Sequence, residues 1–324
     1  MTRPAQPLPD SLRNQTLSTA AARRLGLSAD RARRADLHHP HHGVVVTGPP
    51  PRTIVDRAWA LAHVLPEEAW FSHSTAAQLR ALPLPRALEG GPLHVAVPRE
   101  LRALRRQGVV GHQRDLADPA FERLMLPTSA GELVPLRVAA PGALALTVAC
   151  QLSIADVVAV IDALRLVDDV GATEDIDRML ERSSRRAGAS ALRRAVALSA
   201  SGVRSRAETH LRLTLAAAGL PEVDVAPPVR TPLGVLHPDL AWPQFGVLVE
   251  YEGERHRTDA RQFASDLARF DAFTDAGWSA VRAVKNDLYS NSRRLVATLA
   301  RRLRQRGWRP SRPPRPPHHP LALP

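Results

Sequence analysis

Three acidic side chains in the C-terminal third of the sequence have types and spacing that suit the binding of a divalent cation. Asp239 follows a proline, and Glu250 and Glu252 stand at the end of an apolar run. Alternate residues of a β-strand share one face, so these carboxylates converge on one cation if two neighbouring strands carry them. The alternative is a solvated strand end in which Glu250 pairs with an arginine.

Two adjacent strands are the elements that must position these acids. Residues 236–241 and 245–251 are apolar runs of strand length, and the turn-prone Trp242-Pro243-Gln244 between them predicts a hairpin. Uncompensated anions in a buried strand would cost on the order of several kcal/mol. Mg²⁺ or Mn²⁺ would offset this cost, because hard cations prefer oxygen ligands and a catalytic ion keeps water molecules to activate.

The flanking patterns predict a helix containing Glu208, a strand near residues 223–229, the hairpin, an amphipathic helix through Phe270, and a last strand over residues 279–284. This order resembles the restriction-endonuclease-like, PD-(D/E)XK nuclease fold. Over residues 204–308 the chain is more closely similar to the C-terminal domain of unknown function that is related to the very-short-patch-repair (Vsr) endonucleases. The resemblance implies an α/β domain with a mixed sheet.

The resemblance also implies a catalytic site and a Mg²⁺ or Mn²⁺ cofactor. Lysine is expected two places after the second acid, but this position holds Glu252, where the closer family usually has aspartate. Lys285 is the only lysine in the sequence, and it lies too far along the chain to replace it. Residues Asp266 and Arg269 match a helical Asp-x-x-Arg pattern of the family. The implied site residues are Glu208, Asp239, Glu250, Glu252 and His256, of which Asp239, Glu250 and Glu252 would bind the metal.

An active site of this kind would hydrolyse phosphodiesters. The metal would polarise a phosphodiester oxygen and acidify a bound water molecule, and His256 would act as general base or as leaving-group acid. A histidine suits both roles because its ordinary pKa is about 6.5. The alternatives are that His256 is a surface residue and that Glu208 lies on the exposed polar face of its helix.

The N-terminal region has the spacing of a helix-turn-helix. Ser18 is expected to cap a helix over residues 19–25, and Ser28 a second helix over residues 29–37, followed by a wing strand over residues 43–47. The pattern resembles the winged-helix region of AbiEi-type antitoxins, which implies DNA binding. The alternative is a helical hairpin that packs on the protein and touches no DNA. The residues expected to contact DNA are Arg31, Arg33 and Arg34.

Residues 51–170 are similar to the middle segment of the same AbiEi-like proteins and are expected to form an α+β domain. Ser72, His73 and Ser74 have no accompanying acid or oxyanion motif, so we interpret them as the N-cap of a helix over residues 75–82. A further helical stretch is expected over residues 142–166. The full organisation predicted for this α/β and α+β multidomain chain is a winged helix (1–50), the middle domain (51–170), a helical linker (171–203), the Vsr-like domain (204–308) and a disordered Arg/Pro tail (309–324).

Charge, cysteine content and hydrophobicity limit the classes of protein to which the chain can belong. Most of the net charge of +12 lies after Asp287, because nine arginines and no acid follow that residue. An amphipathic basic helix is expected over residues 293–306. A lone cysteine, Cys150, excludes an intramolecular disulfide, and the sequence lacks an apolar run of membrane-spanning length or a signal core, so we expect a cytoplasmic protein.

Three functions remain open from the sequence alone. The first is a DNA-binding protein with a metal-dependent endonuclease domain. The second is an antitoxin-type transcriptional regulator whose nuclease fold is catalytically silent. The third is a component of a toxin-antitoxin or defence system whose middle segment binds a protein partner. Fold resemblance does not rank them, because one scaffold hosts many activities.

Overall fold

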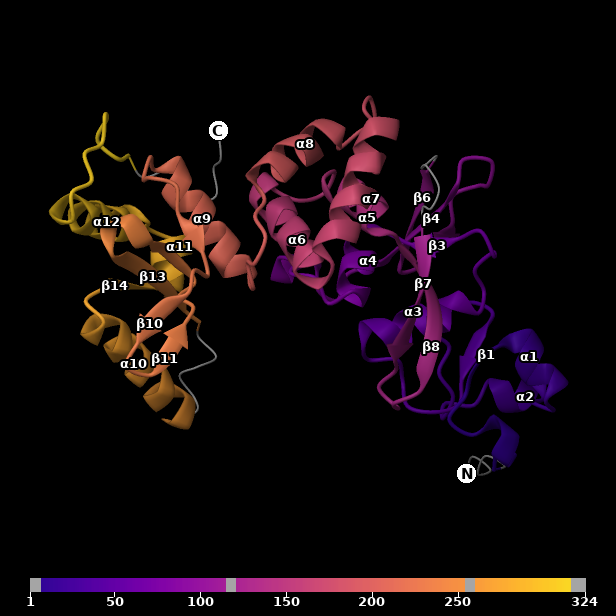
Figure 1. Cartoon of the computed structure of the whole chain (residues 1–324). Coiled ribbons are helices and arrows are strands. Elements are labelled where there is room, and N and C mark those ends of the chain that lie inside the picture. Colours follow the sequence, from indigo (N-terminus) through magenta and orange to yellow (C-terminus); the bar gives the residue numbers. More distant parts are fainter. Residues whose placement is uncertain (1–6, 115–120, 254–259, 316–324) are drawn as a thin grey trace. The chain divides into compact units, whose positions relative to one another are not determined.

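The chain folds into helices and mixed sheets that form two compact units (Figure 1). The computed structural model describes residues 7–114, 121–253 and 260–315. The first unit comprises Met1–Val148 with Asp175–Ser183, and the second comprises Ala149–Glu174 with Ser184–Pro324. Within the described residues, no helix is both long and apolar enough to cross a membrane.

The first unit begins with a small subdomain and continues into a larger sheet. The subdomain holds η1 (Asp10–Leu12), β1 (Thr16–Ser18), α1 (Thr19–Arg24), α2 (Ala29–Ala32) and β2 (Val44–Val46), and β1 pairs with β2 in an antiparallel two-stranded sheet. The larger sheet has the strand order β5-β6-β4-β3-β8-β7 and mixes parallel and antiparallel pairs. Its elements are α3 (Ile54–Ala62), β3 (Trp70–Phe71), α4 (His73–Leu79), η2 (Arg86–Leu88), β4 (Leu93–Pro98), β5 (Arg105–Arg106), β6 (Val109–Arg114), β7 (Phe121–Pro127), β8 (Leu133–Ala139) and α5 (Pro141–Val148).

The helix-turn-helix prediction is correct at its caps and wrong in the length of the second helix. The hydroxyl oxygens of Ser18 and Ser28 accept hydrogen bonds from backbone N–H groups of α1 and α2, as expected. However, α2 ends at Ala32 rather than at residue 37. Beyond this end the chain turns back, and the side chain of Arg31 forms an ion pair with Asp36. The strand expected as a wing is present, but its three valines are buried, so it belongs to the core of the subdomain.

Helices link the sheet of the first unit to the sheet of the second. The stretch expected as one helix over residues 142–166 is two helices, α5 and α6 (Ile154–Val167), and Ser153 caps the second of them. The predicted linker contains α7 (Asp169–Arg182) and α8 (Ala189–Leu198). Within the second unit, α6 packs against α8 and α9 (Arg206–Ala217).

The sheet of the second unit has four strands in the order β14-β13-β12-β9. The predicted antiparallel pairing is confirmed, because β12 pairs with β13, and β13 pairs with β14 in parallel. The first predicted strand, 236–241, is wrong in its bounds, because Leu236 ends β11 and β12 begins only at Leu240. The single strand expected near residues 223–229 is divided, since Pro227 and Pro228 lack the N–H groups that a ladder needs. The elements are β9 (Asp224–Val225), β10 (Val229–Thr231), β11 (Gly234–Leu236), β12 (Leu240–Trp242), η3 (Pro243–Phe245), β13 (Val247–Glu252), α10 (Ala260–Asp275), β14 (Ser279–Val284), α11 (Lys285–Tyr289) and α12 (Arg293–Gln305).

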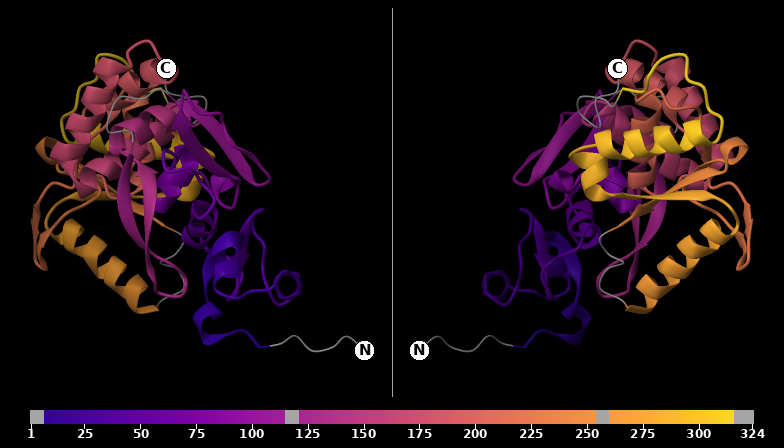
Figure 2. Two further views of the ribbon diagram at one scale, coloured as in Figure 1. Left: turned by 90° about the vertical axis from the view of Figure 1, so that its right-hand side faces the viewer. Right: turned by 90° about the vertical axis from the view of Figure 1, so that its left-hand side faces the viewer.

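Helices cover both faces of this sheet, with α12 on one side and α10 on the other (Figure 2). Successive residues of β13 project to opposite faces of the sheet, so they belong to two different hydrophobic cores. Val247 and Val249 pack with Leu299 of α12 and with α9, whereas Leu248 packs with Phe273 of α10. Glu250 and Glu252 continue the register of Leu248, so they belong to the face that α10 covers. The predicted basic helix is α12, and beyond it the backbone N–H of Arg315 donates to the carbonyl oxygen of Ala218.

Candidate functional site

The pairing of β12 with β13 brings Asp239 and Glu250 together. Leu240 pairs with Val249 in an antiparallel register, and one further step places Asp239 opposite Glu250. Residues directly opposite each other in an antiparallel pair project to the same face, with Cβ atoms about 5 Å apart. Two of the three acids predicted to share a metal site therefore project from neighbouring strands on one side of the sheet.

Asp239 is held by the backbone of the next strand. Its Oδ2 accepts a hydrogen bond from the N–H of Tyr251 at 2.7 Å. Burial and the negative charges of Glu208 and Glu250 raise the pKa of Asp239 to about 7. The Tyr251 hydrogen bond and the charge of Arg269 lower this pKa, but they do not outweigh the other causes. Near neutral pH this carboxyl group therefore releases its proton readily when a cation approaches.

Glu208 joins this group from the first turn of α9. Ser205 is the N-cap residue of α9, and its hydroxyl donates to Glu208 Oε1 at 2.9 Å and accepts from the Glu208 N–H at 3.2 Å. The N–H of Arg204 donates to Oε2 at 2.9 Å. With 8% of its surface exposed, Glu208 is buried, so the alternative of an exposed polar-face residue is wrong. Burial raises the pKa of Glu208, and the charge of Glu250 raises it further.

Glu250 pairs with an arginine from α10. Arg269 donates from Nη2 to Oε1 at 2.9 Å and from Nε to Oε2 at 3.2 Å, which is a two-pronged carboxylate contact. The same guanidinium group lies 5.3 Å from the ring centroid of Phe273 and also contacts the carbonyl oxygen of His237. Arg269, which matches the Asp-x-x-Arg pattern, therefore lies in the site. Its ion pair with Glu250 is the arrangement expected under the alternative, in which Glu250 pairs with an arginine.

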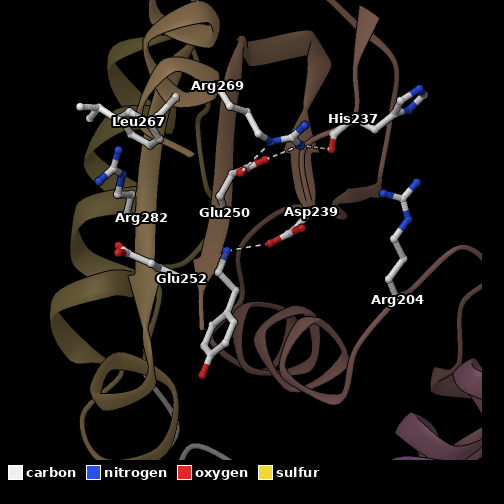
Figure 3. Close-up of a pocket in the computed structure, with 10 residues that line it drawn as sticks. Arg204, His237, Asp239, Glu250, Glu252, Leu267, Arg269 and Arg282 are labelled. Carbon is white, nitrogen blue, oxygen red and sulfur yellow. Dashed lines mark hydrogen bonds and ion pairs between the residues drawn. The ribbon is translucent and has the colours of Figure 1, made fainter. Parts of the chain in front are cut away.

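A cavity of about 250 Å³ opens over Asp239, Glu250 and Arg269 (Figure 3). Asp239, Glu250 and Glu252 all line it, together with Arg204 and Arg282. Figure 3 shows Asp239 directed toward β13 and the carboxyl group of Glu252 directed away from Asp239. Arg282 stands beside Glu250 in the parallel register of β14, and its guanidinium carbon lies 4.3 Å from the ring centroid of Phe270. The cavity therefore combines carboxylates with guanidinium groups that suit phosphate.

Sequence reasoning missed three basic residues of the cavity, namely Arg204, His237 and Arg282. The position of Arg282 follows from alternation along the last strand, because Ala280 and Arg282 must share the face that Glu250 occupies once the strands are paired in parallel. The register between strands, however, is absent from the sequence pattern of either strand. His256 lies outside the described residues, as does the side chain of Asp266.

The carboxylates fit a cation that keeps most of its water. Over residues 7–114, 121–253 and 260–315, the acids of the cavity do not form a set of three oxygens that all lie within 4.8 Å of one another. Mg²⁺ is commonly bound through one or two carboxylates, with water completing an octahedron. Asp239 with either Glu208 or Glu250 satisfies this requirement, and the raised pKa of Asp239 marks a negative charge that lacks a full counter-charge.

The N-terminal arginines differ in their freedom to contact DNA. Arg31 is bound to Asp36 by two hydrogen bonds of 2.9 and 2.7 Å, and its side chain is only 13% exposed. Arg33 is exposed and lies 3.6 Å from Asp30 in a surface ion pair. Arg34 is exposed. The part of the predicted DNA contact that the fold leaves accessible is therefore Arg33 and Arg34.

Comparisons supply no family for this chain. No family model, no curated protein and no solved structure matches the chain.

Proposed function

We propose that this protein binds DNA through its N-terminal subdomain and hydrolyses phosphodiesters with Mg²⁺ or Mn²⁺ in the cavity of the four-stranded sheet. One observation carries the proposal. Asp239 sits in a partly buried position beside Glu208 and Glu250, which raises its pKa to about 7. A divalent cation held by Asp239 and one of these glutamates would offset both the burial of the charge and the repulsion.

The residues of the cavity divide the work between metal and phosphate. Asp239, with Glu208 or Glu250, would hold the cation, which when bound supplies a Lewis acid and an acidified water molecule. Arg282 projects from the strand beside Glu250 and would contact a phosphate oxygen. In this proposal Arg282 would take the role of the lysine that the nuclease pattern expects at the position of Glu252. Arg204 lines the same cavity and would contact the adjoining phosphate.

Metal-dependent nicking of plasmid DNA tests this proposal. Purified protein is incubated with supercoiled plasmid and with single-stranded DNA, with and without Mg²⁺ or Mn²⁺. Cleavage that needs the cation and is lost in Asp239→Asn supports it. Asp224→Asn is the matched control, because it removes an exposed acid from β9 of the same sheet. Cleavage that survives Asp239→Asn would overturn the assignment of the site.

The ion pair between Glu250 and Arg269 favours a second candidate, a DNA-binding regulator of the antitoxin class with a catalytically silent nuclease fold. Arg269 neutralises the acid that the cation would otherwise use. The matching experiment measures binding to a DNA fragment from upstream of the protein's own gene. Binding that depends on Arg34 but not on Asp239, with no cleavage of any substrate, supports the regulator. Metal-dependent cleavage would exclude the silent form.

A further inference from the structure

Three histidines lie together on the six-stranded sheet of the first unit, outside the cavity described above. In the parallel register of β4 with β6, His94 pairs with Val110 and Ala96 pairs with His112. The two histidines therefore project to the same face, two residues apart along the strands. His73 begins α4 directly after β3, which is the other neighbour of β4. Three segments distant in the sequence thus converge.

The three imidazole rings are close enough to share one ion. Each ring offers one nitrogen atom, and the three atoms all lie within 4.8 Å of one another. His94 Nδ1 and His112 Nε2 are 2.9 Å apart, and the rings of His73 and His112 stack with centroids 3.8 Å apart. Nitrogen ligands at about 2.0–2.1 Å from a tetrahedral Zn²⁺ lie about 3.4 Å from one another. Small side-chain rotations would convert the observed cluster into that geometry.

The hydrogen bonds of His73 determine which of its nitrogens carries a lone pair. Arg114 Nη2 lies 2.8 Å from His73 Nε2, and a guanidinium group can only donate. Nε2 is therefore the acceptor, so Nδ1 carries the proton and donates to Ser72 Oγ at 2.9 Å. Metal-binding histidines are held in the same way, with one nitrogen on the metal and the other donating to an oxygen.

The cluster is sheltered from solvent to different degrees. His73 is buried, whereas His94 and His112 are partly buried, so one side of the cluster remains open to an incoming ion. A buried imidazole needs partners for its polar nitrogen atoms, and a metal ion is one such partner.

Arg114 explains how the cluster is stabilised without an ion. Its guanidinium group donates to the lone pair on His73 Nε2 that a metal would use, and its buried Nε has no hydrogen-bond partner among the described residues. The side chain thus places a positive charge beside the three rings. Metal binding requires this group to move away, which makes Arg114 a competitor of the ion.

We propose that His73, His94 and His112 form a binding site for a transition-metal ion of the Zn²⁺ class, with Arg114 occupying the ligand position of His73 in the metal-free form. Three imidazoles suit Zn²⁺, Co²⁺, Ni²⁺ and Cu²⁺ rather than Mg²⁺. Water completes a four-coordinate site. The ion would tie α4 to β4 and β6. This site is independent of the carboxylate cavity, which prefers hard cations.

Titration with Co²⁺ followed by competition with Zn²⁺ tests the proposal. The full chain is produced without a histidine tag and carries Asp239→Asn, which removes the aspartate from the proposed carboxylate site. The expected result is one equivalent of Co²⁺ with the intense visible absorption of a four-coordinate site, which Zn²⁺ abolishes. Absence of that absorption would overturn the proposal.

Variants assign the site to its residues. His112→Gln is expected to weaken binding by more than about 100-fold, which exceeds the usual effect of an outer-shell partner. His42→Gln, at an exposed histidine of the same unit, is the matched control and should bind like the parent. Arg114→Gln removes the competitor and should bind more tightly. Circular dichroism checks that each variant folds. Unchanged binding in His112→Gln, or weaker binding in Arg114→Gln, would contradict the assignment.

Discussion

Replacing Asp239 with asparagine isolates the electrostatic cost of the carboxylate cavity. Asparagine has nearly the same shape and keeps an oxygen that accepts the hydrogen bond of the Tyr251 N–H, which is 2.7 Å long in the wild-type protein. The substitution removes only the ionisable group. We expect Asp239→Asn to raise the free energy of unfolding at neutral and alkaline pH, which is opposite to the effect of most substitutions at partly buried polar sites.

The sign follows from the direction in which the fold moves the pKa. The pKa of Asp239 is about 7 in the folded protein, against an ordinary value of 3.8. Between these values the unfolded chain has lost the proton and the folded protein keeps it, so the stability of the wild type falls as pH rises. A tenfold change in the acid dissociation constant corresponds to about 1.4 kcal/mol, which sets a ceiling of about 4 kcal/mol. Asp239 retains some contact with water, and we therefore expect a gain of about 2 kcal/mol.

Urea unfolding of the wild type and Asp239→Asn at a series of pH values measures this gain. The difference in unfolding free energy should be close to zero near pH 4 and should reach its full value near pH 8. Asp224→Asn, the exposed acid of β9, is the control for removing a charge from the same sheet. Mn²⁺ at about 100 times its Kd should then stabilise the wild type by about 2.7 kcal/mol at pH 8 and leave Asp239→Asn unchanged.

Two results would refute this reasoning. A difference between wild type and Asp239→Asn that is the same at every pH would show that the carboxyl group is not destabilised by its surroundings. Equal stabilisation of both proteins by Mn²⁺ would place the cation elsewhere. Either result would remove the physical basis of the proposed hydrolytic site, even if the fold itself is correct.

Three further predictions address other parts of the molecule. Asp156→Asn should lower the free energy of unfolding by about 2 kcal/mol at neutral pH. Burial alone would raise the pKa of Asp156, but hydrogen bonds and a neighbouring arginine outweigh it and hold the pKa at about 2. Urea unfolding at decreasing pH should show the difference between the two proteins fading toward pH 2. Gly142→Ala should cost about 1–3 kcal/mol in thermal unfolding, since its methyl group would lie against the backbone carbonyl of Asp175, and an equal stability would contradict the packing. Arg34→Ala should weaken DNA binding and reduce the slope of log affinity against log salt by about 1, whereas Arg31→Ala should mainly lower stability; equal effects of the two on the salt slope would argue against this assignment.

The sequence was sufficient to predict the elements that hold the carboxylate cavity. An apolar run of strand length predicted β13, and the turn residues around Pro243 predicted the hairpin that places Asp239 near Glu250. These signals are local, because periodicity and turn chemistry act over a few residues. The short α2 was not predictable in the same way, because the ion pair between Arg31 and Asp36 forms only after the chain turns back.

The sequence pattern did not predict contacts between segments that are distant along the chain. Glu250 and Arg269 belong to different elements, and their contact depends on how α10 crosses the sheet. The histidine cluster shows the same limit. His73 was interpreted as part of a helix cap, but the Ser72 hydroxyl contacts the His73 ring rather than the helix backbone. His94 and His112 carry no motif spacing at all, and only the pairing of β4 with β6 brings them together.

The energetics of the cavity decide between the two functions better than the fold does. A silent platform would gain stability by replacing Asp239 with a neutral residue, because among the described residues the acid accepts one backbone hydrogen bond, from Tyr251, and faces two further acids. Arg269 forms its ion pair with Glu250, and its charge offsets only part of the burial and repulsion that raise the pKa of Asp239, so ionised Asp239 remains a cost to the folded state. A group that lowers stability at a fixed position is expected where function requires it. This imbalance favours the cation-binding interpretation, and it is what the asparagine substitution measures.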